Sequence, residues 1–359
     1  MREKPAAGSS LARRVSVERS GLPSNETNLS PLSALPRLLL IALAALAGLA
    51  GAARAADCAF TPPPADRLQS TAAVSDYRPT LKACVAADGR KAVAIREMTV
   101  AGQKLALLAD PEALTTRLER AACWTCSEMS EAELKSTRMG RAISESAEAP
   151  GLIHRGFLQN AGLTHGAGPG DFVTGDLCPS KRPLDRVFFT RLETASPHAS
   201  VALGISGLWL VHHFDDLRWL IDQRDSGALD ILWVDHTYHH PYLARLPLAA
   251  NFLLTKGVDP EAEILDTERL LIANGETPSL FFRFPGLVSS DPLMQAVSRF
   301  HLVTLGADAW LAKGQQPEKG SIVLVHPNGN EPKGLAMFTR DLKRGTIAAP
   351  LEPLTAAPE

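Results

Sequence analysis

The sequence from residue 171 onward predicts an α/β fold with a parallel sheet, either open or closed into a barrel. The first observation is a series of short apolar runs, at 172–174, 201–205, 231–234, 280–282, 302–305 and 322–325. The second is that helix-length segments separate these runs, with apolar residues at helical spacing such as Leu184, Val187, Phe188 and Leu192. Strands that alternate with helices in this way pair in parallel.

Residues capable of catalysis or metal binding follow several of these runs, each at the point where the predicted strand ends. They are Asp176, His236, His240, Arg283, Asp308 and His326. In a parallel barrel the catalytic groups gather at the C-terminal ends of the strands and come from several of them. We therefore expect these side chains to share one site.

The first 55 residues predict a signal peptide with an N-terminal extension. An apolar run at 38–53 follows Arg37, and Ala53-Arg54-Ala55 is a small-x-small cleavage pattern. We expect cleavage after Ala55, export to the periplasm or the medium, and no stable membrane span in the mature protein. The alternative is an uncleaved N-terminal anchor, because the run is nearly long enough to span a bilayer.

Residues 56–150 predict a small α+β module. Apolar residues over 91–109 predict two strands joined near Gly102, and Asp110-Pro111 is typical of a helix start. Residues 127–150 are polar and suit a linker or a surface helix. The remaining segment, 151–359, predicts the parallel-sheet domain, with its core at about 171–340.

All five cysteines lie beyond the predicted cleavage site. Because an exported protein meets an oxidising compartment, we expect disulfides, and sequence-local pairing joins Cys58 to Cys84 and Cys123 to Cys126. The alternative is that Cys123 and Cys126 form a redox CxxC motif of a thiol–disulfide protein. The net charge of −2 gives no basic field that would attract nucleic acid.

His236 and His240 are four residues apart, so on a helical turn their rings converge on one metal ion. Neutral imidazoles suit zinc first, with cobalt or nickel as alternatives. Thr237 stands where the HExxH motif of metalloproteases needs glutamate, which disfavours a protease. The competing interpretation is an ordinary polar loop rich in histidine.

The other strand-end residues have both a catalytic and a structural interpretation. Asp176 is a candidate general base or metal ligand, and Arg283 is a candidate for holding its carboxylate in the ionised form. His326 is a candidate general acid, with Asp308 to orient it. Taken one at a time, each also has a structural interpretation. Asp176 could cap a helix, Arg283 could form a surface ion pair, and His326 could be a hydrogen-bonded histidine at the end of the sheet.

Five segments, in order, resemble the motifs of the NodB-type polysaccharide deacetylases, carbohydrate esterase family four. Residues 236–241 (HTYHHP) fit the family's His-Ser/Thr-x-x-His-Pro motif at every defined position, and residues 174–179 (TGDLCP) match the Thr and Pro of Thr-Phe-Asp-Asp-Gly-Pro. Arg283 with Pro285, Asp308 with Trp310, and the Leu-x-His at 324–326 match the other three. The resemblance covers roughly residues 171–340.

The resemblance implies a distorted (β/α) barrel and metal-assisted removal of an N- or O-acetyl group from a polysaccharide or oligosaccharide. It implies His236 and His240 as metal ligands and Asp176 as the base. It further implies that Arg283 holds Asp176 and that Asp308 supports His326 as the acid. In the same reading, Tyr238 and Trp310 line the site for the acetylated glycan.

One position departs from the family pattern: Leu177 stands where the family has its second Asp, a metal ligand. The metal is then held by two histidines with waters or another group, or it binds weakly, or catalysis is lost and the protein is a glycan-binding relative. Cys178 is a possible thiolate ligand or a buried thiol. We expect Leu177→Asp to tighten metal binding.

A serine esterase is disfavoured because the segment around Ser206 (GISG) is not GxSxG.

Overall fold

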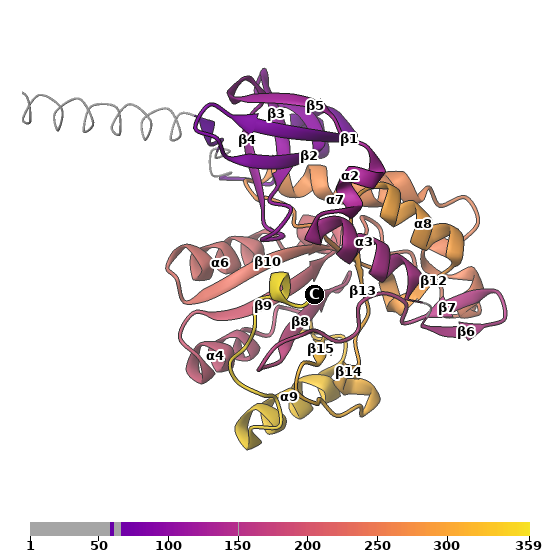
Figure 1. Cartoon of the computed structure of the whole chain (residues 1–359). Coiled ribbons are helices and arrows are strands. Elements are labelled where there is room, and N and C mark those ends of the chain that lie inside the picture. Colours follow the sequence, from indigo (N-terminus) through magenta and orange to yellow (C-terminus); the bar gives the residue numbers. More distant parts are fainter. Residues whose placement is uncertain (1–57, 61–65, 150) are drawn as a thin grey trace, which may run out of the picture. The chain divides into compact units, whose positions relative to one another are not determined.

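The computed structural model describes residues 58–60, 66–149 and 151–359 (Figure 1). The predicted signal peptide, its apolar run at 38–53 and the cleavage site after Ala55 lie outside the described residues. Within the described part, no helix is both long and apolar enough to cross a membrane.

The N-terminal module is a five-stranded antiparallel sheet in the order β4-β3-β2-β1-β5. Its elements are η1 (Thr71–Ala73), β1 (Val74–Ala86), β2 (Lys91–Val100), β3 (Gln103–Ala109), β4 (Thr116–Arg120), η2 (Ala121–Cys123), β5 (Trp124–Glu128), α2 (Glu131–Lys135) and α3 (Arg138–Glu148). The two strands predicted over 91–109 are present as β2 and β3. The polar stretch after residue 127 forms the two short helices.

The prediction of a helix beginning at Asp110 is wrong. The Asp110 carboxylate accepts hydrogen bonds from the backbone N–H groups of Glu112 and Ala113, which closes a turn, and the chain then enters β4. Leu114 and Leu118 are both buried, and their spacing of four imitates a helical face. The backbone of Leu114 has a positive φ of 58°, so the chain reverses there instead of coiling.

The disulfides join Cys58 to Cys123 and Cys84 to Cys126, so the sequence-local pairing is wrong. The reason is the antiparallel pairing of β1 with β5, which places Cys84 directly opposite Cys126. Cys123 and Cys126 therefore bond to different partners. This contradicts a redox CxxC pair.

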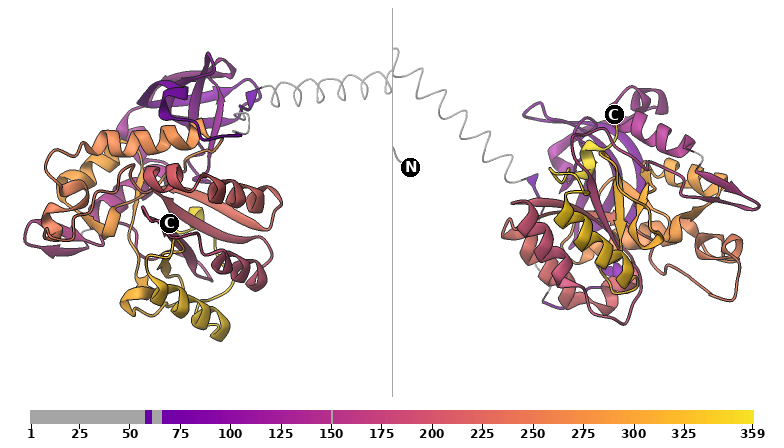
Figure 2. Two further views of the ribbon diagram at one scale, coloured as in Figure 1. Left: turned by 180° about the vertical axis from the view of Figure 1, so that it is seen from behind. Right: turned by 90° about the horizontal axis from the view of Figure 1, so that it is seen from below.

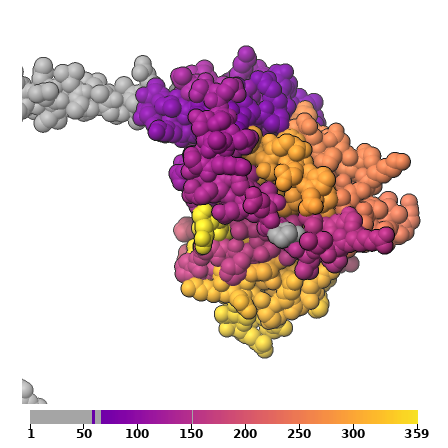
Figure 3. All heavy atoms as spheres, turned by 45° about the vertical axis from the view of Figure 1, so that its right-hand side comes forward, coloured from indigo at the N-terminus to yellow at the C-terminus, as the bar shows by residue number. Residues whose placement is uncertain are grey.

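The module is joined to the larger domain by a buried ion pair. Arg96 donates through Nε and Nη2 to both carboxylate oxygens of Glu268 on α7 (Pro260–Ala273), at 2.7 and 2.8 Å. Tyr77 donates its hydroxyl to the same carboxylate at 2.7 Å. Figure 3 shows the indigo and purple atoms of the module in direct contact with the orange atoms of the larger domain.

The larger domain is built on a curled sheet of seven parallel strands in the order β13-β11-β10-β9-β8-β15-β14. The strands are β8 (Phe172–Leu177), β9 (Ala199–Ile205), β10 (Leu229–Asp235), β11 (Phe281–Arg283), β13 (Val303–Leu305), β14 (Ala309–Trp310) and β15 (Ile322–Val325). A second, three-stranded sheet contains β6 (Leu152–His154), β7 (Phe157–Gln159) and β12 (Val288–Ser289). The predicted distorted (β/α) barrel, preceded by an α+β module, is confirmed.

Helices follow most of the strands of the parallel sheet, and α4, α6 and α9 lie along one face of it (Figure 2). They are α4 (Arg186–Ala195), α5 (Gly207–His212), α6 (Phe214–Asp225), α7, α8 (Asp291–Arg299) and α9 (Pro332–Arg344), with single 3-10 turns η3 (Leu248–Ala250), η4 (Phe252–Leu254), η5 (Pro285–Leu287), η6 (Leu311–Lys313) and η7 (Leu354–Ala356). Helix α7 begins where the sequence signals it, with Asp259 as cap and Pro260 in the first turn.

Strand alternation separates two apolar cores and determines what β8 presents to each side. Phe172 packs into the core shared with the N-terminal module, whereas Val173 and Leu177 pack into the core beneath α4, α6 and α9. Successive side chains of a strand point to opposite faces of the sheet. Asp176 therefore points away from the core that contains Leu177.

Candidate active site

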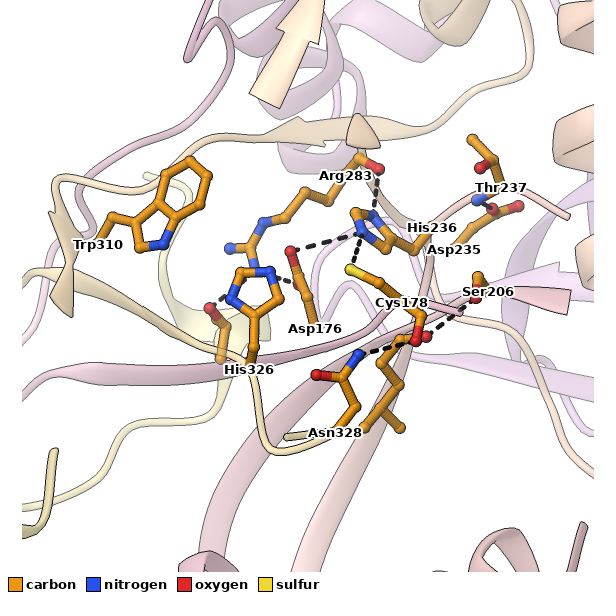
Figure 4. A network of polar contacts seen from close by, with 12 residues as sticks. Asp176, Cys178, Ser206, Asp235, His236, Thr237, Arg283, Trp310, His326 and Asn328 are labelled. Carbon is orange, nitrogen blue, oxygen red and sulfur yellow. Dashed lines mark hydrogen bonds and ion pairs between the residues drawn. The ribbon is translucent and has the colours of Figure 1, made fainter. Parts of the chain in front are cut away.

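Four of the predicted residues meet at the C-terminal edge of the parallel sheet (Figure 4). Asp176 lies at the end of β8, His236 directly after β10, Arg283 at the end of β11 and His326 directly after β15. In the sheet β10 and β11 are neighbours, as are β8 and β15, with β9 between the two pairs.

A buried ion pair joins Asp176 to Arg283. Arg283 Nη1 donates to Asp176 Oδ1 at 2.9 Å and to Thr174 Oγ1 at 2.8 Å, while Nη2 donates to the backbone carbonyl of Gly306 at 3.0 Å. Burial by itself raises the pKa of Asp176, but Arg283, with the neighbouring His236 and His326, together outweigh it, and the net pKa lies below the usual value. The carboxylate is therefore ionised at neutral pH.

His236 is fully buried and its tautomer is set by the backbone. Its Nδ1 lies 2.8 Å from the carbonyl oxygen of Arg283, which can only accept, so Nδ1 carries the proton. Nε2 lies 3.5 Å from Cys178 Sγ and 3.6 Å from Asp176 Oδ2. Burial lowers the pKa of His236, but Asp176 and Cys178 outweigh it and raise the net value.

His236 and His240 converge through a loop and not through the predicted helical turn. The segment after β10 contains two residues in the left-handed region, Thr237 at φ 67° and His240 at φ 48°. The loop brings the two imidazole rings to a centroid distance of 4.9 Å. Left-handed backbone at non-glycine residues costs energy and is concentrated at functional sites.

The atoms around His236 Nε2 suit a cation. One ligand atom each of Cys178, His236 and His240 lies within 4.8 Å of the others, and His240 Nε2 is buried without a hydrogen-bond partner in the described part. The negatively charged Asp176 oxygen faces the same place. Imidazole nitrogen and thiol sulfur are donors that bind zinc.

Glu331, which the sequence analysis missed, takes the place next to His326 that was predicted for Asp308. Glu331 Oε2 lies 2.8 Å from His326 Nδ1 and accepts a hydrogen bond from Trp310 Nε1 at 2.8 Å. Asp308 instead contacts His165 Nδ1 at 2.7 Å and accepts from the backbone of Ile322.

The surroundings of His326 favour its protonated form. Burial by itself lowers its pKa, but the negative charges of Cys178, Glu331 and Asp176 outweigh burial and raise the pKa to about 10. The imidazolium therefore carries a proton at neutral pH. A protonated histidine beside a surface cavity is able to donate that proton to a bound molecule.

The residues around the site line a cavity of about 590 Å³. Its lining includes Cys178, His240, Tyr242, Trp310 and His326. A second cavity of about 460 Å³ shares Tyr242 and Trp310 with the first, so the two cavities are adjacent.

Tyr238, which was predicted to line the glycan site, is not part of either cavity wall. Its ring packs over the backbone of Gly207, where a Cβ atom would lie 2.4 Å from the ring. Tyr242 occupies the cleft instead and is 56% exposed. Trp310 lines both cavities, as the prediction for that residue requires.

Ser206, the serine weighed as an esterase nucleophile, is fully buried and has a structural role. Its hydroxyl donates to the backbone carbonyl of Leu177 at 3.0 Å and accepts from the backbone N–H of Trp209 at 3.3 Å. The hydroxyl caps α5 and does not face the cleft. This arrangement argues against a serine esterase.

The prediction that Leu177 occupies the position of a missing metal ligand is wrong. Its side chain is fully buried in the apolar core that also contains Ile205 and Trp209. A carboxylate at this position would enter that core and would not reach His236. The expectation that Leu177→Asp tightens metal binding is therefore withdrawn.

We expect Leu177→Asp to lower the free energy of unfolding by about 3–5 kcal/mol, the usual cost of an unpaired buried charge. Leu177→Met, which keeps the volume and the apolar character, is the matched control and should cost under about 1.5 kcal/mol. Denaturant unfolding of both variants measures the difference. A stable Leu177→Asp variant that binds zinc more tightly than the wild type would show that residue 177 faces the metal site after all.

No family model matches the chain. Similar solved structures include a family 4 carbohydrate esterase from Bacillus anthracis, at 16% identity over 54% of this chain and 86% of that one, with a TM-score of 0.40. A family 4 carbohydrate esterase from Streptomyces lividans in complex with acetate matches at 18% identity over 54% and 98% of the two chains, with a TM-score of 0.36.

A third similar structure is a mutant, with restored enzymatic activity, of a family 4 pseudoenzyme from Bacillus anthracis. Its identity to this chain is 17% and the TM-score is 0.35. The match covers 50% of this chain and 64% of the pseudoenzyme, less than two thirds of its length. These identities and scores assign no chemistry to this chain.

Proposed function

We propose that this protein is a metal-dependent hydrolase that removes N- or O-acetyl groups from a polysaccharide or oligosaccharide. One observation carries the proposal: an ionised, arginine-held Asp176 faces a cluster of metal-binding donors, with His326 beside the same cleft. The order of the five sequence segments that resemble the NodB-type deacetylases supports it.

Each residue has a role that follows from its contacts. Asp176 Oδ1 is occupied by Arg283, whereas Oδ2 faces the donor cluster and accepts the proton of the attacking water. His326 donates its proton to the departing amine or alkoxide, and Glu331 holds the imidazole in position. Arg283 keeps Asp176 charged and oriented.

His236 and His240 would hold the metal, with zinc preferred and cobalt or nickel as alternatives. A divalent ion bound there supplies electrophilic polarisation of the acetyl carbonyl and a nucleophile from water at neutral pH. The fixed tautomer of His236 prepares its Nε2 for such binding.

The cleft suits a sugar chain. Trp310 and Tyr242 present aromatic rings to it, and such rings combine an apolar face with a polar edge. The two adjacent cavities together have room for more than one sugar ring. We therefore propose an acetylated glycan as the substrate class.

Acetate release from the purified protein tests the proposal, on a panel of N-acetylated oligosaccharides, O-acetylated oligosaccharides and an acetyl-lysine peptide. We expect release from at least one carbohydrate class, its abolition by a chelator, and recovery on adding zinc. Release from the peptide alone would contradict the glycan assignment. Release that the chelator does not affect would contradict the metal.

A catalytically impaired relative that binds acetylated glycans is the second candidate. It is favoured by the donor cluster of Cys178, His236 and His240, which contains no carboxylate such as the resembled family uses as a metal ligand. Glycan binding without acetate release at full zinc occupancy would select this candidate.

We also propose that the protein is exported, with the mature chain beginning at Ala56 and divided into a module at 56–150 and a deacetylase-like domain at 151–359. The two disulfides support export, since such bonds persist in oxidising compartments.

A further inference from the structure

The donor cluster contains a third side chain able to bind a metal, the thiol of Cys178. Cys178 is buried, and it is the free cysteine of the chain because the other four of the five form the two disulfides. We propose that the Cys178 thiolate is the third protein ligand, in a Cys-His-His centre that prefers zinc or cobalt to magnesium, calcium or manganese. This inference rests on the proposed function only for the presence of a metal.

The spacing of the donors fits one tetrahedral ion. Cys178 Sγ lies 3.5 Å from His236 Nε2. Two ligands at a tetrahedral angle, with zinc–sulfur and zinc–nitrogen bonds of about 2.3 and 2.0–2.1 Å, lie about 3.5 Å apart. His240 completes the set within 4.8 Å, and a catalytic zinc site has three protein ligands with one open position.

Strand geometry explains why residue 178 supplies this ligand and residue 177 does not. Side chains alternate along β8, so Asp176 faces the site and Leu177 enters the core behind it. Cys178, the first residue after β8, faces the site again. The side-chain amide of Asn328, fully buried, donates to the backbone carbonyl of Cys178 at 2.7 Å and fixes its position.

Asp176 is the competing candidate for the third ligand. Its Oδ1 is held by Arg283, and Asp176 lies outside the three-donor cluster of Cys178, His236 and His240. A carboxylate that must accept a proton is also better left uncoordinated. The chemistry of the set follows from the thiolate, because soft sulfur ligands select zinc over the hard oxygen-seeking ions.

Cobalt substitution of the metal-free protein tests the ligand directly. With one equivalent of Co²⁺ we expect the near-ultraviolet charge-transfer absorption of a thiolate–cobalt bond in the wild type and in Asp176→Asn. Cys178→Ser should lose this absorption. Loss of a residue that only supports a metal ligand costs 10–100-fold in metal affinity. Cys178→Ser removes a ligand itself, so its Kd for zinc should rise by more than that.

Alkylation of the wild type provides a second measurement that needs no variant. At a zinc concentration 100 times Kd, the rate of Cys178 modification by iodoacetamide should fall by about 100-fold, because ligation withdraws the free thiolate by mass action. Magnesium at the same concentration is the control and should leave the rate unchanged. Equal protection by the two ions would overturn the proposed selectivity.

The inference is overturned if wild-type protein binds cobalt stoichiometrically without the charge-transfer absorption and zinc leaves alkylation unaffected. That result indicates a plain S–H···N hydrogen bond between Cys178 and His236. Zinc-dependent acetate release in the same sample would leave the proposed function standing. Conversely, charge-transfer absorption in a protein that releases no acetate keeps the Cys178 ligand and removes the deacetylase.

Discussion

Replacing Asp176 with asparagine is expected to lower kcat for acetate release by about 10²–10⁴-fold, the usual contribution of a general acid–base group. Asparagine keeps the shape of the side chain and offers Arg283 an oxygen, so the variant should fold. It cannot take the proton of the attacking water. Initial rates of acetate release, normalised to bound metal, measure the effect.

Asp230→Asn is the matched control for this variant. Asp230 is exposed near the N-terminal end of β10, and its carboxylate accepts only from Ser200 Oγ among the described contacts. We expect its activity to equal that of the wild type. If Asp176→Asn instead loses the metal while residual hydrolysis remains, Asp176 is a ligand and the base lies elsewhere.

The second large effect is expected at His326. His326→Gln should lower kcat by about 10²–10⁴-fold, because it removes the donor for the leaving group. The loss should be greatest for substrates with a poor leaving group, such as an amide, and smaller for an ester. Comparing N-acetylated and O-acetylated sugars therefore provides a readout that misfolding would not mimic.

Glu331 and Asp308 separate the structural account of His326 from the sequence-based one. Glu331→Gln should reduce kcat less than His326→Gln does and shift the pH profile, because it removes the charge 2.8 Å from Nδ1. Asp308→Asn should leave both unchanged, since Asp308 contacts His165. A larger loss in Asp308→Asn than in Glu331→Gln would contradict this assignment.

The sequence predicts the parallel-sheet domain well because its signals are local. Buried parallel strands appear as short apolar runs, and each of the six predicted runs is a strand of the structure. The convergence of His236 and His240 was also predicted, though by the wrong geometry. Only the positive φ values of Thr237 and His240 bring the rings together, and spacing alone does not show them.

The roles of Leu177, Cys178 and Glu331 could not be predicted in the same way. Which of two neighbouring residues faces the site depends on strand register. A motif alignment gives the position of a residue in the sequence but not the face of the sheet to which its side chain points. Glu331 lies five residues after His326, just before α9, and the turn at 327–330 brings it back to the imidazole. The Glu-Pro pair signals that helix start, but nothing local indicates the contact.

In the N-terminal module, pairing between strands distant in the sequence made the local predictions wrong. Cys84 and Cys126 meet because β1 and β5 are antiparallel neighbours, although 42 residues separate them. Leu114 and Leu118 imitate a helical face, yet pairing of β4 with β3 decides the structure. Tertiary contacts of this kind override local propensity.

Zinc titration of the metal-free protein, with acetate release followed on its best glycan substrate, tests the central claim most directly. The account predicts that activity rises from near zero in proportion to added zinc and reaches a plateau at one equivalent. His236→Ala and His240→Ala should stay at the baseline at the same zinc concentrations. Activity that is complete before zinc is added, or that persists in both histidine variants, would contradict the account.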